Sequence, residues 1–405
     1  MNHYPYLLLG GGLASGAAIQ TLIEEGVPGD QIGLVTLEPE LPYNRPPLSK
    51  GFLANKESRE SLFIEPQSYY DDHGVTVKLA TAVTSLTPKA LELTTDKAER
   101  LTFDRALIAT GSRPRRLGVP GADLAQIFTL RTVADSEAIK IAARAAKTAV
   151  VVGAGFIGLE AAATLAGSGL QVTILHRGTQ LLDRFADATM AKFFFDYFTS
   201  KGVQFRLETT VDHFEGMAGR VTTVVTDHNE ELAADLVIVG IGVELNLDFV
   251  KDQSLRIENG LLVDEQLETA VPGIFAAGDI ANFPDGIFGR KRRRIEHWDH
   301  AIASGKQAAR NMLGKNEEFH HLSYFFSDMF DLSFELWGDT DDPAELVFSA
   351  SPTEVSAVAW YLRDKKVAAY FAAHRPESEK EQAQEWIRSA KEVTRSMITV
   401  GLHSS

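Results

Sequence analysis

Two glycine-rich segments of the chain have the residue types that bind a diphosphate. The first reads LLLGGGLASG over residues 7–16, and the second reads VVVGAGFIG over residues 150–158. In each, glycines directly after an apolar run permit a tight turn and a close approach of the diphosphate to the backbone. The first amides of the following helix would donate to the phosphate oxygens. Each segment therefore predicts the strand, turn and helix that open a dinucleotide-binding unit, and two such segments in one chain strengthen both assignments.

The first turn is predicted to bind an adenosine-containing cofactor. Gly10 permits the bend and Gly12 lets the diphosphate approach, while Ser15 takes the third position and is small enough for close helix–strand packing. Glu38 lies 23 residues after Ser15, at the end of the predicted second strand. A carboxylate there binds ribose hydroxyls, although Glu38 could also be an ordinary surface acid.

The second turn has the complete glycine pattern, with Gly153, Gly155 and Gly158. The strand that corresponds to the one ending at Glu38 ends here in His176 and Arg177, without an acid. A missing carboxylate and an added arginine favour a 2′-phosphate, and therefore NADPH. If Arg177 points to solvent, either NADH or NADPH would bind. Two dinucleotide sites in one chain suggest a flavin and a nicotinamide.

The elements that position these residues alternate between apolar strands and helices. The pattern predicts an α/β fold with two Rossmann-like dinucleotide-binding domains and a C-terminal α+β domain. We place a discontinuous first domain at 1–112 and 245–320, the second domain at 113–244 and the C-terminal domain at 321–405. The predicted strands are 6–9, 32–37, 148–152, 171–175, 235–240, 354–362 and 366–373, and the predicted helices are 12–26, 155–168, 299–313 and 376–391.

The composition of the chain excludes several classes of redox protein and of binding partner. The 405 residues include no cysteine, which excludes a redox disulfide, thiolate metal sites and cysteine-held clusters. Electrons that reach a flavin must therefore leave to an acceptor outside the chain. The net charge of −15 argues against nucleic-acid binding. The sequence contains no run of eighteen apolar residues, so we expect no membrane-spanning helix. The absence of a secretory signal predicts a cytoplasmic protein.

Five consecutive cations are the exception to this acidity: Arg290, Lys291, Arg292, Arg293 and Arg294. They are either a solvated loop or a docking patch for an acidic partner. His297 and His300 are three residues apart and His320 and His321 are adjacent, but no third ligand completes a metal site, so we predict none.

Several further motifs give the chain a family resemblance. They are PYNRPPLSK at 42–50, ATGSRPR at 109–115, GFIGLE at 155–160, AAGD at 276–279 and EHW at 296–298. With these, the chain resembles the FAD-dependent pyridine nucleotide oxidoreductases of the ferredoxin/rubredoxin reductase type. Apoptosis-inducing factor and monodehydroascorbate reductase are relatives in that family. The resemblance implies a glutathione-reductase-like arrangement of the two dinucleotide domains.

The resemblance also implies roles for residues. Lys50 and Glu160 would meet beside flavin N5 as the catalytic pair, although an ordinary structural salt bridge is the alternative. The residues expected to hold FAD are Gly10, Gly12, Ala14, Ser15, Glu38, Arg45, Lys50, Val83, Ala109, Thr110, Gly111, Arg131, Gly278, Asp279, Glu296, His297 and Trp298. Those expected to hold NAD(P)H are Gly153, Gly155, Phe156, Ile157, Gly158, Glu160, His176, Arg177 and Gly242.

The electron acceptor stays open between three readings. The first is an acidic carrier, a ferredoxin or rubredoxin, docked on residues 290–294. The second is a small acceptor, such as a monodehydroascorbate-like radical or a quinone, which the aromatic segment 324–337 favours. The third is a redox-responsive interaction protein like apoptosis-inducing factor, for which a nicotinamide-induced homodimer would be expected.

Overall fold

The computed structural model describes residues 2–183, 187–341, 345–351 and 355–399. The chain divides into two compact units, each assembled from segments that are distant in sequence. Unit 1 contains residues 1–44, 59–113 and 244–324, and unit 2 contains residues 45–58, 114–243 and 325–405. Unit 2 thus joins the predicted nucleotide domain to the C-terminal residues and to a short early segment.

Unit 1 is built on a seven-stranded sheet. Its strands are β1 (Asn2–Leu9), β2 (Ile32–Val35), β3 (Thr76–Lys78), β4 (Val83–Thr87), β5 (Glu92–Thr95), β6 (Arg100–Ile108) and β18 (Ile274–Ala276). The order is β3-β2-β1-β6-β5-β4, with β18 also paired to β6. Strands β1, β2, β3, β6 and β18 pair in parallel, whereas β4 and β5 form an antiparallel edge. The apolar run at the end of β1 is fully buried, as expected for a central parallel strand.

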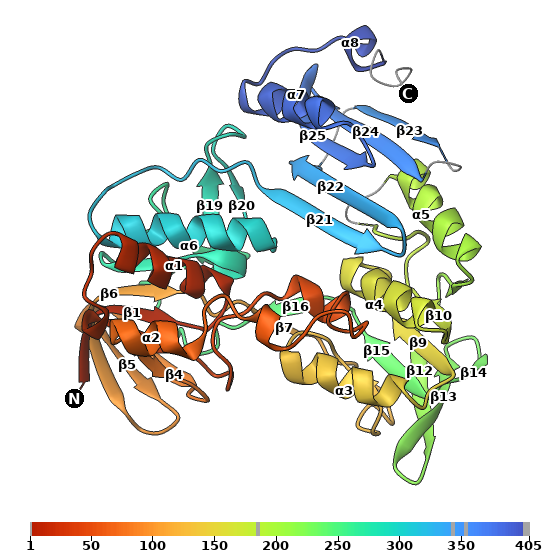
Figure 1. The fold of residues 1–405 in the computed structure, drawn as a ribbon, viewed down its shortest axis with the longest axis horizontal. Coiled ribbons are helices and arrows are strands. Elements are labelled where there is room, and N and C mark those ends of the chain that lie inside the picture. Colours follow the sequence, from red (N-terminus) through yellow and green to blue (C-terminus); the bar gives the residue numbers. More distant parts are fainter. Residues whose placement is uncertain (1, 184–186, 342–344, 352–354, 400–405) are drawn as a thin grey trace. The chain divides into compact units, whose positions relative to one another are not determined.

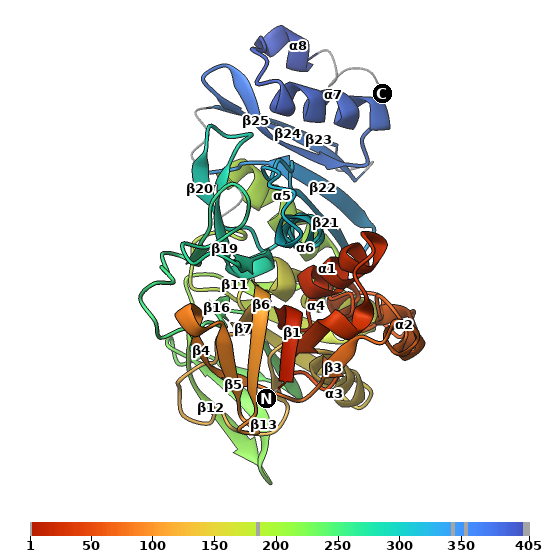
Figure 2. The ribbon, with the colours of Figure 1, turned by 90° about the vertical axis from the view of Figure 1, so that its left-hand side faces the viewer.

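The helices of unit 1 are α1 (Leu13–Glu24), α2 (Gln67–His73) and α6 (Trp298–Met312). Helices α1 and α6 pack side by side (Figures 1 and 2). Small residues permit this contact, because a Cβ added to Gly305 of α6 would lie 2.2 Å from the carbonyl oxygen of Ala14. Strands β17 (Leu261–Leu262), β19 (Ala281–Asp285) and β20 (Lys291–Arg293) form a separate small sheet.

Unit 2 contains a second parallel sheet, ordered β11-β10-β9-β15-β8. Its strands are β8 (Ile127–Phe128), β9 (Thr148–Val152), β10 (Gln171–Leu175), β11 (Gln204–Arg206) and β15 (Leu236–Val239). The same part of the chain contains the helices α3 (Val133–Ala143) and α4 (Phe156–Gly167). A separate antiparallel sheet has three strands, β12 (Val211–Met217), β13 (Arg220–Thr226) and β14 (Glu231–Ala233). Strands β7 (Ser112–Pro114) and β16 (Val243–Leu245) include the residues at which the chain changes unit.

The C-terminal part of unit 2 is a five-stranded sheet between helices. Its strands are β21 (Tyr324–Met329), β22 (Leu332–Gly338), β23 (Glu345–Ser351), β24 (Ser356–Arg363) and β25 (Lys366–Ala373), in the order β21-β22-β25-β24-β23. On one face, Trp386 of α7 (Glu377–Arg388) packs on Trp360. On the other, Phe194 of α5 (Ala188–Ser200) packs on Phe334 and Phe371. Figure 2 shows α7 and α5 on opposite sides of this sheet. A short helix, α8 (Arg395–Thr399), follows.

The two parallel sheets and the mixed C-terminal part confirm the predicted fold class. Sequence patterns located β9 and β10 to the residue but missed α5, whose run of aromatic residues resembles a core strand as much as a helix. Among the described residues, no helix is long and apolar enough to cross a membrane.

Candidate functional site

The first glycine-rich turn is open where a ligand would approach. Gly10 has φ +101°, and a Cβ there would lie 2.5 Å from the carbonyl oxygen of Ala109, so only glycine fits. Gly12 has no atom within 4 Å of an added Cβ. It precedes α1, whose first turn has no side-chain cap. Open space beside uncapped helix amides is the form of a diphosphate site.

Ser15 is fully buried, so it serves helix packing and does not line the turn. The corresponding position of the second turn, Gly158, could not accept a side chain, because a Cβ there would lie 2.1 Å from the carbonyl oxygen of Gly153. The first helix therefore leaves room at this position that the second helix does not.

Glu38 receives a hydrogen bond from a buried tyrosine. The hydroxyl of Tyr43 donates to Oε2 of Glu38 over 2.5 Å, and Tyr43 is only 1% exposed. The neighbouring Leu37 is 70% exposed, which is unusual for a leucine beside a strand end. An oriented carboxylate next to exposed apolar surface suits an adenosine, whose ribose needs an acceptor and whose base needs apolar contact.

A second cluster of predicted residues gathers at the ends of β6 and β18 in unit 1. Thr110 Oγ1 donates to the carbonyl oxygen of Asn246 over 2.7 Å, and the Asn246 amide donates back to the Thr110 carbonyl over 3.0 Å. Asp279 accepts from Ser112 Oγ over 2.7 Å. These ends are the carboxyl edge of a parallel sheet, where open α/β folds bind ligands. Ala109, Gly111 and Gly278 belong to the same turns.

The predicted EHW segment leads into α6 in unit 1. His297 is the N-terminal cap residue of α6, and Trp298 Nε1 donates to Asn44 Oδ1 over 2.9 Å. Burial, reinforced by the charge of Arg293, lowers the pKa of His297 to about 4, so its imidazole is neutral at pH 7. Glu296 is exposed and pairs with Arg294. Of the remaining predicted flavin contacts of unit 1, Val83 is the first residue of β4 and Ala14 is buried in the first turn of α1.

Arg45 and Arg131, two of the predicted FAD residues, belong to unit 2 and contact each other. Arg45 Nη1 donates to the carbonyl oxygen of Arg131 over 2.7 Å. The backbone amide of Arg131 donates to Asp135 Oδ2, which also caps α3. Lys50, another predicted flavin contact, is in unit 2 as well.

The second glycine-rich turn repeats the geometry of the first. Gly153 has φ +108°, and a Cβ there would lie 2.2 Å from the carbonyl oxygen of Gly240. Gly155 and Gly242 have open space around an added Cβ, and α4 begins without a side-chain cap. Ile157 and Ile241 beside these glycines are 46% and 36% exposed. This surface suits a second dinucleotide.

His176 points inward. It is 8% exposed, and its Nδ1 accepts a hydrogen bond from the Ala154 amide of the turn over 3.3 Å. Burial, together with the charge of Arg177, lowers its pKa, so the ring is neutral. The nitrogen that could accept from a ribose hydroxyl is thus already used. Arg177 is exposed, and its contact with a 2′-phosphate stays a prediction.

Lys50 and Glu160 form the buried ion pair that the family resemblance implied. Lys50 Nζ lies 2.6 Å from Glu160 Oε1. Glu160 is 3% exposed and lies in α4, one turn after Phe156. Its carboxylate also accepts from Ser49 Oγ over 2.5 Å and from Ser327 Oγ over 2.6 Å. The three donors account for the burial of a charged group.

The cationic run 290–294 has less positive charge available for a partner than its sequence indicates. It comprises Arg290, strand β20 and Arg294, and its four guanidinium groups are all engaged within unit 1. Arg293 is the most buried and bonds Asp285 Oδ2 over 2.9 Å. The other partners are Glu265 for Arg290, the carbonyl oxygens of Val263 and Asn282 for Arg292, and Glu296 with the Asp279 carbonyl for Arg294. Lys291 is exposed. Docking on this run stays a prediction.

Protein side chains contact His300 and His321, two of the histidines considered above as metal ligands. His321 Nε2 lies 2.5 Å from Asp299 Oδ2, while His300 is fully buried and stacks on Phe283. Within the described ranges, no three His, Cys, Asp or Glu residues group as metal ligands.

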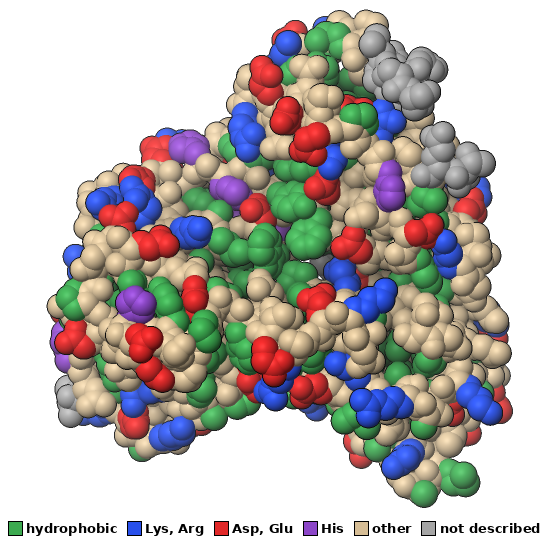
Figure 3. All heavy atoms as spheres, in the orientation of Figure 1, with side chains coloured by type: hydrophobic (Ala, Val, Ile, Leu, Met, Phe, Trp, Pro, Cys, Tyr) green, Lys and Arg blue, Asp and Glu red, His purple; other side chains and the backbone are tan. Residues whose placement is uncertain are grey.

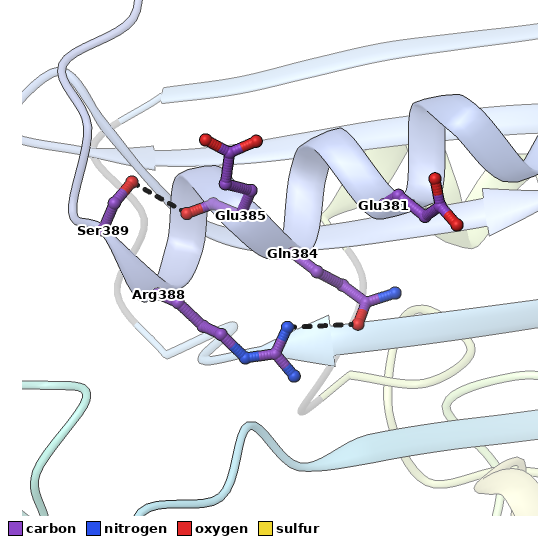
Figure 4. Close-up of a pocket in the computed structure, with 5 residues that line it drawn as sticks. All are labelled: Glu381, Gln384, Glu385, Arg388 and Ser389. Carbon is purple, nitrogen blue, oxygen red and sulfur yellow. Dashed lines mark hydrogen bonds between the residues drawn. The ribbon is translucent and has the colours of Figure 1, made fainter.

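A depression of about 500 Å³ lies elsewhere, on the exposed side of α7 (Figure 4). Its lining is Glu381, Gln384, Glu385, Arg388 and Ser389. All five come from one helix and its end, and two of their hydrogen bonds are local ones, Arg388 to Gln384 and Ser389 to the Glu385 carbonyl. Side chains of one helix do not converge on a ligand from several directions, so we assign no site here.

Comparison with known proteins places this geometry in a family. The family model described as pyridine nucleotide-disulphide oxidoreductase matches residues 4–305. Rhodocoxin reductase of Rhodococcus erythropolis is 34% identical, over 82% of this chain and 78% of its own length. Monodehydroascorbate reductase of Pisum sativum is 31% identical, over 94% and 93%. The crystal structure of the covalent putidaredoxin reductase–putidaredoxin complex matches with a TM-score of 0.92 and 29% identity, covering 98% of this chain and 95% of that chain.

The chain belongs to the pyridine nucleotide-disulphide oxidoreductase family. It is an oxidoreductase that uses a flavin and NAD(P)H, and the two open turns fit two dinucleotides. Because it has no cysteine, it lacks the redox disulfide for which the family is named.

Sequence reasoning missed several residues around these sites. Tyr43 and Ser49 lay inside the recognised 42–50 motif but received no role, although both bond a predicted site carboxylate. Ser327 carried no usable signal, because it is separated from Glu160 by 167 positions and lies in an aromatic strand. Asn246 received no role from the sequence, yet it bonds Thr110 twice.

Proposed function

We propose that this oxidoreductase binds FAD with the residues of the first turn and NAD(P)H with those of the second. Electrons then leave singly to an external carrier, a ferredoxin or rubredoxin. The observation that carries this proposal is the pair of ligand-open glycine turns in a chain without cysteine. Relatives named as reductases of small redox proteins support the choice of acceptor.

The proposed FAD contacts in unit 1 serve three parts of the cofactor. Gly10 and Gly12 hold the diphosphate, Glu38 holds the adenosine ribose, and Asp279 takes a ribityl hydroxyl at the carboxyl edge of the sheet. Each of these positions is open or oriented in the way its ligand requires. The family resemblance assigns Arg45, Lys50 and Arg131, which belong to unit 2, to the same cofactor.

Lys50 has a positioning and an electrostatic task. When bound, FAD would accept a hydride from NAD(P)H and release the two electrons one at a time. A cation beside the reduced ring system favours its negative charge, and Glu160 keeps that cation from being an unpaired buried charge. The pair is prearranged, so no protein reorganisation is needed when the charge develops.

NADPH is the nicotinamide that the second site suits better. Neutral His176 stands where an acid would select NADH, and exposed Arg177 offers a guanidinium to a 2′-phosphate.

Reduction of a small acceptor is the second candidate. It gains weight because four guanidinium groups of the 290–294 run are engaged within unit 1, which leaves less free positive charge for an acidic carrier. A relative named monodehydroascorbate reductase is similar over nearly the whole chain.

Steady-state turnover separates the candidates. The holoenzyme is assayed with NADH and with NADPH against a ferredoxin, a rubredoxin, a quinone and monodehydroascorbate. Efficient turnover with ferredoxin or rubredoxin supports the proposal. Turnover with only the quinone or monodehydroascorbate would contradict it and support reduction of a small acceptor. A nicotinamide complex that persists in air, with a change in oligomer size, would instead indicate a redox-responsive interaction protein. Ferricyanide is unsuitable, because it accepts electrons from nearly any reduced flavin.

A further inference from the structure

The carboxylate of Glu160 is held from two segments of unit 2 that are far apart in sequence. Ser49 and Lys50 belong to the short segment 45–58, and Ser327 belongs to strand β21 of the C-terminal sheet. Lys50 Nζ and Ser327 Oγ both lie 2.6 Å from Oε1, while Ser49 Oγ lies 2.5 Å from Oε2. Ser327 is fully buried, so its hydroxyl has no water to replace this bond.

The register between α4 and β21 places Ser327 at this position. Phe156 and Glu160 are four residues apart on α4 and therefore share one helix face. Phe325 and Ser327 are two apart on β21 and share one strand face. The rings of Phe156 and Phe325 lie 4.3 Å apart, so an apolar contact and a polar contact dock the two elements together. The spacings match, because four helical residues rise about 6 Å and two strand residues about 6.7 Å.

A slip of one residue would remove this arrangement. It would turn Phe326 or Asp328 toward Glu160 in place of Ser327, and neither a ring nor a second carboxylate can donate a hydrogen bond to it. Asp328 is already bonded by Ser333 of the neighbouring strand. The aromatic contact therefore fixes which polar side chain reaches the ion pair.

We propose that Ser327 is a positioning residue for the reaction, acting through Glu160. Its hydroxyl fixes the Glu160 carboxylate, and that carboxylate in turn fixes Lys50 Nζ. The C-terminal sheet thereby holds the pair in its working geometry. This inference deepens the proposed function and rests on the roles of Lys50 and Glu160 given there.

The first test is the substitution Ser327→Ala, with Ser333→Ala as the matched control. Ser333 also bonds a carboxylate of β21, but that carboxylate is Asp328 and not Glu160. In stopped-flow mixing of the holoenzyme with NADPH, we expect Ser327→Ala to lower the limiting rate of flavin reduction about ten-fold, the loss expected for one bond to a charged group. The concentration of NADPH for half-maximal rate and the FAD content should change less than two-fold, and Ser333→Ala should leave all three unchanged.

A double-mutant cycle tests whether Ser327 acts through Glu160. In the Glu160→Gln background, the side chain that accepts the Ser327 hydrogen bond is neutral. The ten-fold effect of Ser327→Ala on the flavin reduction rate should therefore shrink to under three-fold. The same non-additivity is expected in the urea midpoint of unfolding, a readout that requires no turnover.

Three results have distinct meanings. A Ser327→Ala reduction rate within two-fold of the parent overturns the inference. A full ten-fold effect that persists in the Glu160→Gln background also overturns it, since Ser327 would then act by another route. Failure of the unsubstituted protein to be reduced by either NADH or NADPH would contradict the proposed function itself.

Discussion

Lys50 Nζ and Glu160 Oε1 lie 2.6 Å apart in a buried part of unit 2. Removing the cation should have two separable effects. We expect Lys50→Met to slow flavin reduction by NAD(P)H at least ten-fold while FAD stays bound, because the charge beside the reduced ring is lost. Stopped-flow reduction measures this, and an unchanged rate would remove Lys50 from the mechanism.

The same substitution should lower stability, since it leaves the Glu160 carboxylate buried without its cation. The expected loss is about 3 kcal/mol in the free energy of unfolding, which urea denaturation can measure. The control is the double variant Lys50→Met/Glu160→Gln, which should recover most of that stability but not the reduction rate. If both quantities recovered together, the pair would be a structural salt bridge only.

Nucleotide preference should depend on Arg177. We expect Arg177→Ala to raise the KM for NADPH about ten-fold and to leave the KM for NADH unchanged, because only the 2′-phosphate would lose a charge-assisted contact. Lys192→Ala is a matched control, since Lys192 is an exposed cation of the same unit that pairs with Asp196. Equal changes for the two nucleotides would show that Arg177 does not read the 2′ position.

The bond between Tyr43 and Glu38 should tighten FAD binding. Tyr43→Phe removes only the hydroxyl that donates to Glu38 Oε2, so the carboxylate loses its orientation. We expect the Kd for FAD to rise about ten-fold, measured by fluorescence on reconstitution of the deflavinated protein. Glu38→Gln should weaken FAD as well, and Tyr43→Phe should add little in that background. Additive effects of the two changes would contradict the coupling.

Sequence patterns predicted the strands and glycine turns better than the side-chain hydrogen bonds around the sites. The glycine turns follow from local rules, because backbone conformation and helix amides alone make such a site. The inward turn of His176 and the engaged arginines of 290–294 depend on neighbours brought by folding, which a single sequence does not specify. Ser327 is the clearest case, since its partner is fixed by the register of a strand against a helix.

Acid should destabilise unit 1 through His300. Burial lowers the pKa of this histidine to about 3, and the positive charge of Arg293 adds a smaller effect in the same direction. Above the ordinary histidine pKa both states are neutral. As pH falls below that value, only the unfolded state takes the proton, so stability is lost progressively down to about pH 3.

Between pH 7 and pH 5 this effect should cost about 2 kcal/mol of unfolding free energy. The substitution His300→Phe keeps a ring against Phe283 and removes the titrating group. Its unfolding free energy, measured in urea at both pH values, should therefore fall less with acid than that of the parent. If the unfolding free energies of the two proteins fell equally between pH 7 and pH 5, His300 would not be the group that causes the loss.

An anaerobic electron count on the purified holoenzyme tests the proposed relay from NADPH through the flavin to a one-electron carrier. One equivalent of NADPH is added together with excess ferredoxin, and reduced ferredoxin is measured by its visible absorption. We expect the nucleotide to reduce the flavin, and two ferredoxins to be reduced for each NADPH oxidised, because NADPH delivers two electrons and the carrier accepts one. If the flavin is reduced by NADPH or NADH but passes no electrons to ferredoxin or rubredoxin, the proposed relay to an external one-electron carrier is wrong.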